Sequence, residues 1–200
     1  MKISYYKGLV VTSEREVSAQ ETEQLVTFTK AFFDDSEKLE RTEVYDNKRL
    51  LRVNYYKDED VESLRAFHLQ NYSGMVFSRW KTLARVQGYV WEWAYSFDAS
   101  GELRGMSKTL SDGSERPLMQ IDMDENHHIV QITKYYWEDN LRYAFEYNEN
   151  GSFSNGYDGL YGDHATLPEV KDSLSDFRFY ENGWNLPEAI ANTAIPPDPQ

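Results

Sequence analysis

YVWEWAYSFDASG, residues Tyr89–Gly101, is the stretch that decides the fold of this chain. Aromatic residues occupy every second position of it, namely Tyr89, Trp91, Trp93, Tyr95 and Phe97. Because a β-strand points alternate side chains to opposite faces, the stretch predicts a strand with one aromatic face. Asp98-Ala99-Ser100-Gly101 then predicts a turn, since Asp bonds to its own backbone and Gly tolerates a positive φ.

Two later segments, Met119–Ile129 and Tyr143–Phe153, repeat this pattern of strand and turn. In all three copies, alternate apolar residues lead to an Asp or Asn, which stands at positions 98, 124 and 148. Weaker turns at residues 71–74 and at Asp46 extend the spacing backwards. Regular spacing of this kind indicates repeated hairpin units. The alternative is a set of ordinary hairpins that share turn chemistry.

The expected fold class is α+β, with a strongly twisted, mainly antiparallel β-meander. Ser18–Glu21 has the pattern of a capping box, and Leu25, Phe28 and Phe32 follow at helical spacing, so we predict an N-terminal helix over residues 19–33 that packs on the sheet. Short helices are expected near 60–70 and 167–174, and an edge strand at Phe177–Tyr180.

The chain is expected to form one domain over residues 1–190, followed by an extended C-terminal tail over 191–200. Three of the seven residues 194–200, at positions 196, 197 and 199, are proline. Proline lacks the backbone donor that helices and central strands need, so we expect no core residues there.

Cysteine is absent, which excludes disulfides and thiolate chemistry. The sequence contains no apolar run of the length that a signal peptide or a membrane span needs. The interpretation from sequence is therefore a cytoplasmic protein that does not interact with membranes.

The net charge of −13 is unevenly distributed along the chain. Residues 121–200 carry 15 acidic and 4 basic residues, so most of the excess negative charge lies there. Phosphate backbones would be repelled by this part, which argues against nucleic-acid binding. A basic protein partner would explain the charge, and so would a simple contribution to solubility.

No motif for catalysis or cofactor binding is present, so no enzyme activity and no cofactor are expected. His127 and His128 are adjacent and would point to opposite faces of a strand, which is poor geometry for one metal ion. Asp158, Asp163 and His164 lie in a glycine-rich stretch that is expected to be a loop. Oxygen ligands so close together could bind a cation, but their spacing does not match the EF-hand pattern, which favours a solvated loop. An enzyme that uses Asp163 and His164 would need a third group, and the sequence does not supply one.

The unit Tyr95-x-Phe97-Asp98-x-x-Gly101-x-Leu103 resembles the YD repeat of Rhs and teneurin proteins, in which a Tyr-Asp-x-x-Gly pattern builds successive hairpins. Two further segments resemble the short hairpin repeats of some bacterial antitoxin and immunity proteins, namely Phe145-x-Tyr147-Asn148-x-x-Gly151 and Tyr180-Glu181-Asn182-Gly183. The resemblance covers residues 90–155, although the period here is longer and His127 replaces Gly in one copy. It implies a small bacterial sheet protein from a toxin–immunity locus and assigns no functional residue.

The aromatic residues allow two interpretations. Trp91, Trp93 and Tyr95 are core residues under the predicted helix, or they line a small-molecule cavity of a sheet or barrel. Neighbouring aromatics at Tyr135–Trp137 must lie on both faces of a strand, and Tyr and Trp are favoured at interface centres.

The leading functional hypothesis is a non-catalytic immunity protein that binds a basic toxin through an acidic, aromatic surface. The sequence leaves the oligomeric state open. The candidate contact residues are Trp137, Glu138, Asp139, Tyr157, Asp158 and Asp163.

Overall fold

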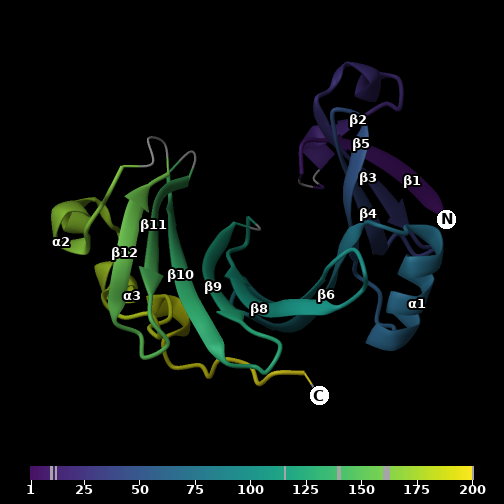
Figure 1. Ribbon diagram of the computed structural model, residues 1–200. Coiled ribbons are helices and arrows are strands. Elements are labelled where there is room, and N and C mark those ends of the chain that lie inside the picture. Colours follow the sequence, from purple (N-terminus) through teal and green to yellow (C-terminus); the bar gives the residue numbers. More distant parts are fainter. Residues whose placement is uncertain (10, 12, 115, 139–140, 160–162, 200) are drawn as a thin grey trace. The chain divides into compact units, whose positions relative to one another are not determined.

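A computed structural model describes residues 1–9, 11, 13–114, 116–138, 141–159 and 163–199 of the chain (Figure 1). Most of the regular structure is β-strand. The strands are β1 (Lys2–Lys7), β2 (Glu16–Val17), β3 (Thr27–Phe33), β4 (Leu39–Asp46), β5 (Arg49–Tyr55), β6 (Val76–Val86), β7 (Tyr89–Phe97), β8 (Leu103–Ser111), β9 (Pro117–Met123), β10 (Ile129–Trp137), β11 (Leu141–Tyr147) and β12 (Phe153–Asp158).

The helices are short, apart from one. They are η1 (Ser13–Arg15), η2 (Glu21–Gln24), α1 (Val61–Asn71), α2 (Leu167–Val170), η3 (Lys171–Ser173), α3 (Phe177–Glu181) and η4 (Glu188–Ile190), where η marks a 3₁₀ helix. The predictions of short helices near 60–70 and 167–174 are confirmed by α1 and by the α2–η3 pair. None of the helices in the described part of the chain has the length and apolarity that crossing a membrane requires.

The strands follow the order β12-β11-β10-β9-β8-β7-β6-β5-β4-β3-β1-β2 in one twelve-stranded sheet. β5 and β6 are parallel, because α1 carries the chain back between them. The other pairings with a described register are antiparallel. The prediction of a mainly antiparallel sheet is therefore confirmed.

Two compact units can be distinguished within the chain. Unit 1 contains residues 1–81 and 94–104, and unit 2 contains residues 82–93 and 105–200. The strands β6, β7 and β8 each begin in one unit and end in the other. The expected single domain over residues 1–190 stays a prediction.

The core of unit 1 lies where α1 covers the sheet. Val53 and Tyr55 of β5, Phe77 of β6 and Phe97 of β7 pack with Leu64 of α1. The rings of Phe77 and Phe97 stack with their centroids 4.5 Å apart. Helix α1 begins at the N-cap Asp60, which accepts a hydrogen bond from the backbone N–H of Ser63 at 2.8 Å.

The prediction of a helix over residues 19–33 is wrong. Its capping box does form, with the backbone N–H of Ser18 donating to Glu21 at 2.7 Å, but it caps only the 3₁₀ helix η2. From Thr27 onwards the chain is strand β3, because β-branched and aromatic residues fit a pleated sheet better than a helix. Phe28 faces Tyr45 of β4, and their rings stack at 4.8 Å.

The turns that follow Asp98, Asp124 and Asn148 share one geometry. In each, the first residue donates its N–H to the carbonyl four residues on, and the fourth residue donates back to the carbonyl of the first. The fourth residue has a positive φ, at 82° for Gly101, 63° for His127 and 83° for Gly151. The turn after Asp34 has the same hydrogen bonds.

The two earlier turns, at residues 71–74 and after Asp46, are present but differ in geometry from the three later ones. Residues 71–74 include the end of α1. Asp46 precedes a different turn, in which Asn47 and Lys48 both have positive φ.

In unit 2, α3 packs on β10 and β11. Tyr180 contacts the rings of Tyr136 and Phe145, and its carbonyl accepts the hydroxyl of Tyr147 at 2.5 Å. The prediction of an edge strand at Phe177–Tyr180 is therefore wrong. Asp176 caps a helix there instead, accepting from the backbone N–H of Phe179 at 3.2 Å.

Candidate functional site

The first two predicted contact residues follow one another at the end of β10. Trp137 is half-buried, and its indole N–H donates to the carbonyl of Pro117 at 2.6 Å. Glu138 is exposed immediately after it. Asp139 lies outside the described residues. An indole edge beside an exposed carboxylate is compatible with a contact surface, although the indole N–H itself already has a partner.

The other three predicted residues lie close to one another at the end of β12. Tyr157 and Asp158 belong to this strand rather than to the predicted loop. The N–H of Asp158 donates to the carbonyl of Asp163 at 2.8 Å. The carboxylate of Asp158 is buried and lies 2.7 Å from Arg142, whereas Asp163 is exposed. Asp163 is therefore available to a partner, and Asp158 serves an internal ion pair.

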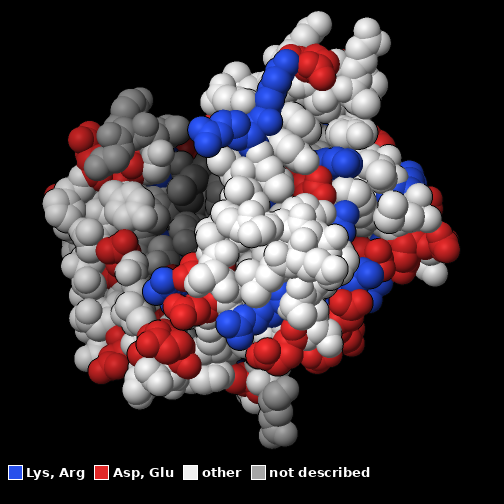
Figure 2. All heavy atoms as spheres, turned by 45° about the vertical axis from the view of Figure 1, so that its right-hand side comes forward, with Lys and Arg blue, Asp and Glu red and all other residues white. Residues whose placement is uncertain are grey.

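The charge of the two units differs strongly. Unit 1 carries 16 acidic and 14 basic residues, and unit 2 carries 18 acidic and 7 basic residues. Figure 2 brings the right-hand side of Figure 1 forward and shows both signs interspersed on that face. From the residue counts, the net charge of unit 2 is −11 and that of unit 1 is −2.

Several cations of unit 2 do not neutralise its surface, because they are turned inward. Lys134 is fully buried and donates to the backbone carbonyls of Phe179, Asn182 and Asn185, the last two at 2.8 and 2.7 Å. Burial lowers the pKa of Lys134, and the negative charge of Asp176 opposes that shift. The three converging carbonyl oxygens favour the ammonium form, because it has one N–H donor for each of them. Lys108 is also buried.

Eight acidic residues of unit 2 are exposed and have no ion pair within the described part of the chain. They are Glu125, Glu138, Glu149, Asp163, Glu169, Asp172, Glu181 and Glu188.

The aromatic strand contributes core residues. Trp91 is 1% and Trp93 0% exposed, so neither indole faces solvent. Trp93 lies beside Lys108, whose Nζ is 5.5 Å from its ring centroid. The predicted cavity lined by Trp91, Trp93 and Tyr95 does not coincide with the cavity of unit 1 described next.

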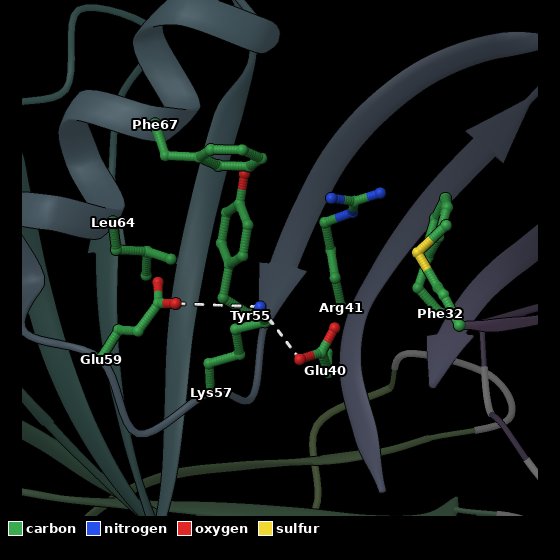
Figure 3. A pocket seen from close by; sticks show the side chains of 9 residues that line it. Phe32, Glu40, Arg41, Tyr55, Lys57, Glu59, Leu64 and Phe67 are labelled. Carbon is green, nitrogen blue, oxygen red and sulfur yellow. Dashed lines mark ion pairs between the residues drawn. The ribbon is translucent and has the colours of Figure 1, made fainter. Parts of the chain in front are cut away.

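Unit 1 has a cavity of about 130 Å³ beside α1 (Figure 3). Apolar groups of Phe32, Tyr55, Leu64 and Phe67 line it, together with charged side chains and Met1. An engineered apolar cavity of about 150 Å³ holds a molecule the size of benzene. The cavity therefore has room for a single ring or one side chain.

Charged residues at the cavity mouth are paired with one another. Lys57 lies 2.9 Å from Glu40 and 3.8 Å from Glu59, as the dashed lines of Figure 3 show. The guanidinium of Arg41 stacks on Phe32, with its Cζ 3.9 Å from the ring centroid. The two acids and two cations leave the lining close to neutral, so it does not select strongly for one sign of charge.

A buried carboxylate lies beside this cavity on β4. Glu43 is 5% exposed and accepts hydrogen bonds from the hydroxyls of Tyr45 and Tyr72, at 2.8 and 2.6 Å. Arg41 and Lys30 lie 3.6 and 3.9 Å from it. Burial, and then Glu43, raise the pKa of both tyrosines, so they remain protonated donors. Because Glu43 accepts a hydrogen bond from Tyr72, the cluster is a structural link between β4 and the end of α1.

His68 of α1 forms a second buried network. Its Nδ1 lies 3.0 Å from the hydroxyl of Tyr55, and its Nε2 lies 3.0 Å from the carbonyl of Met75. The carbonyl can only accept, so Nε2 carries the proton and Nδ1 accepts from Tyr55. Burial lowers the pKa of His68, which keeps the ring neutral. The neutral ring fixes the chain between α1 and β6.

Sequence reasoning missed the cavity and both networks. Their residues come from β3, β4, β5, α1 and the segments next to them, far apart along the chain, and no motif joins them. Lys134 left a readable signal, because it alternates with Ile132 and Tyr136 on one face of β10.

Comparison with protein-family models, with curated proteins and with solved structures finds no match to this chain. In the described residues, no three His, Asp or Glu side chains gather in a way that would hold a metal ion. The functional argument therefore depends on the geometry and charge described above.

Proposed function

We propose that this chain is a non-catalytic binding protein of the bacterial cytoplasm, an immunity protein that neutralises a basic toxin. The observation that carries the proposal is the charge of unit 2. Its net charge is −11, and Lys108, Lys134 and Arg142 are engaged inside the unit rather than on its surface.

A surface of this kind acts first on the rate of association. An acidic face raises the rate constant for association with a basic partner, and this gain falls as salt rises. Trp137 and Tyr157 would supply aromatic contact area next to Glu138 and Asp163. Asp158 contributes indirectly, through its ion pair with Arg142.

The repeated hairpin turns give the proposal additional support. The sequence of these turns resembles the hairpin repeats of bacterial toxin–immunity loci, and the turns at Asp98, Asp124 and Asn148 share one hydrogen-bond pattern. A sheet of successive hairpins presents a broad surface, which suits the binding of a folded protein.

The test is binding to the product of the adjacent gene, with association followed by stopped flow at several salt concentrations. Reversing Glu138 and Asp163 to Lys together is expected to slow association at least tenfold at low salt and to flatten its salt dependence. The matched control reverses Glu14 and Glu102, two exposed acids of unit 1, and so changes the net charge equally. Absence of a complex at low salt, or an equal effect of the control, would contradict the proposal.

A second candidate function is the binding of a small apolar or aromatic molecule in the cavity of unit 1. The specific observation in its favour is the space of about 130 Å³ between Phe32, Tyr55 and Phe67. A panel of single-ring compounds, followed by tryptophan fluorescence and thermal shift, separates the two functions. Phe67→Ala would weaken such a ligand and leave the binding of a toxin by unit 2 unchanged.

A further inference from the structure

A buried lysine of unit 2 binds the chain's own proline-rich segment. Lys108 of β8 has an 8% exposed side chain, and its Nζ donates to the carbonyl of Pro196 at 2.6 Å and to Oδ1 of Asp198 at 2.8 Å. The second oxygen of Asp198 lies 3.2 Å from Nδ1 of His127. The segment is the yellow end of the chain in Figure 1.

Trp93 completes this site. Nζ of Lys108 lies 5.5 Å from the Trp93 ring centroid, and the ring of His127 stacks over the same indole at 6.1 Å. Burial raises the pKa of Asp198, but the hydrogen bonds and charges of Lys108 and His127 outweigh burial and keep this pKa below its usual value. The site therefore combines the ammonium of Lys108 and the imidazole of His127 with the indole ring of Trp93.

His127 occupies a position that favours glycine. In the equivalent turns, Gly101 and Gly151 take the position of positive φ, whereas His127 adopts a φ of 63°. A side chain in this region costs on the order of 1 kcal/mol and persists where its surroundings hold it. The contact with Asp198 gives this costly residue a role.

The bound segment itself is held mainly by polar contacts. None of residues 191–199 is buried, and residues 194–199 have no helix or strand. Prolines at positions 196, 197 and 199 restrict the backbone to extended conformations, which lowers the entropy lost on binding. A segment bound in this way can leave without disturbing the core.

The lysine cannot remain without a counter-charge when the segment leaves. The described ion pairs give Lys108 no carboxylate other than that of Asp198. A buried ammonium that loses its anion is strongly unfavourable. The site therefore requires a carboxylate, from this chain or from another.

We propose that Lys108, His127 and Trp93 form a recognition site for an extended, proline-containing acidic peptide segment of a partner protein. In this structure, residues 195–199 occupy the site as an internal ligand, which the partner's segment displaces. This site lies apart from the exposed acids of the proposed function, so the two proposals fail independently.

The experiment uses the full chain with Asp198→Asn, which removes the internal carboxylate. The probe is a labelled synthetic peptide with the sequence of residues 193–200, followed by fluorescence anisotropy. We expect this variant to bind the peptide at least tenfold more tightly than the unaltered chain, whose site is occupied. Asp172→Asn is the matched control, because it removes the same charge at an exposed position and is expected to leave peptide binding unchanged.

Two further variants in the Asp198→Asn background identify the site. Lys108→Met is expected to reduce peptide affinity at least tenfold, with folding checked by circular dichroism. His127→Gly, which suits the turn and so preserves folding, is expected to reduce it at least threefold. Absence of binding by Asp198→Asn at millimolar peptide, or unchanged binding in the His127→Gly variant, would overturn the proposal.

Discussion

Replacing Lys134 by Met is expected to destabilise unit 2 more than most single changes. The fully buried ammonium donates to three backbone carbonyls, those of Phe179, Asn182 and Asn185, and so attaches α3 and the following segment to β10. Methionine fills most of the same volume but donates nothing, so three buried acceptors lose their partner.

The expected loss of folding free energy in Lys134→Met results from two opposing contributions. Hydrogen bonds to a charged group contribute about 1.5–3 kcal/mol each, so their loss is large. Removing the ammonium also removes its desolvation penalty of several kcal/mol, which offsets part of that loss. The net loss expected for breaking one partner of a buried charged contact is about 3–5 kcal/mol.

Urea unfolding followed by circular dichroism measures this loss, and hydrogen exchange of α3 locates it. The control is Lys171→Met, because Lys171 is exposed beside Phe177 and should contribute less than about 0.5 kcal/mol. Lys134→Arg should not restore stability, since a planar guanidinium does not match three converging carbonyls. A loss below about 1 kcal/mol for Lys134→Met would refute the reasoning.

Three further predictions concern unit 1 and can be checked by denaturation. The free energy of unfolding of unit 1 should fall as the pH drops below 6.5, by up to about 1.4 kcal/mol per pH unit. The folded state lowers the pKa of His68, so the unfolded state binds the proton first. If the stability of His68→Gln depends on pH as steeply as that of the unaltered chain, this histidine is not the cause. Asp60→Ala should cost about 1 kcal/mol by removing the cap of α1, and an unaltered urea midpoint would argue against the cap. Glu37→Gly should stabilise the β3–β4 turn by about 0.5–1 kcal/mol, because Glu37 has a φ of 60°, a conformation that favours glycine. A loss of stability in this variant would show that the exposed ion pair of Glu37 with Lys2 contributes more than the relief of backbone strain.

The sequence predicted those parts of the fold that depend on local pattern. Alternation of aromatic residues located β7, and the Asp and Asn of the turns located three hairpins. Prediction failed where two local signals competed. After the capping box of Ser18 and Glu21, the β-branched and aromatic run from Thr27 to Phe33 formed a strand, since pairing with β1 and β4 outweighed helical spacing.

For the candidate sites, too, the sequence predicts what depends on residue types and not what depends on contacts between distant segments. The acidic surplus of unit 2 can be counted from the sequence, but the inward position of Lys108 and Lys134 cannot. Equally, the ion pair of Asp158 with Arg142 joins neighbouring strands and removes one predicted contact residue from the surface. Tertiary contacts, rather than residue types, decide which charges face solvent.

The parallel pairing of β5 with β6 has a consequence for the order of folding. The hairpin turns of the chain reverse it within a few residues, whereas about twenty residues separate Tyr55 from Val76. By loop-closure entropy, a fourfold longer connection costs about 1.2 kcal/mol more to close. The hairpins of unit 1 can therefore form early and independently, while the docking of β6 waits for α1 and sets the pace of assembly.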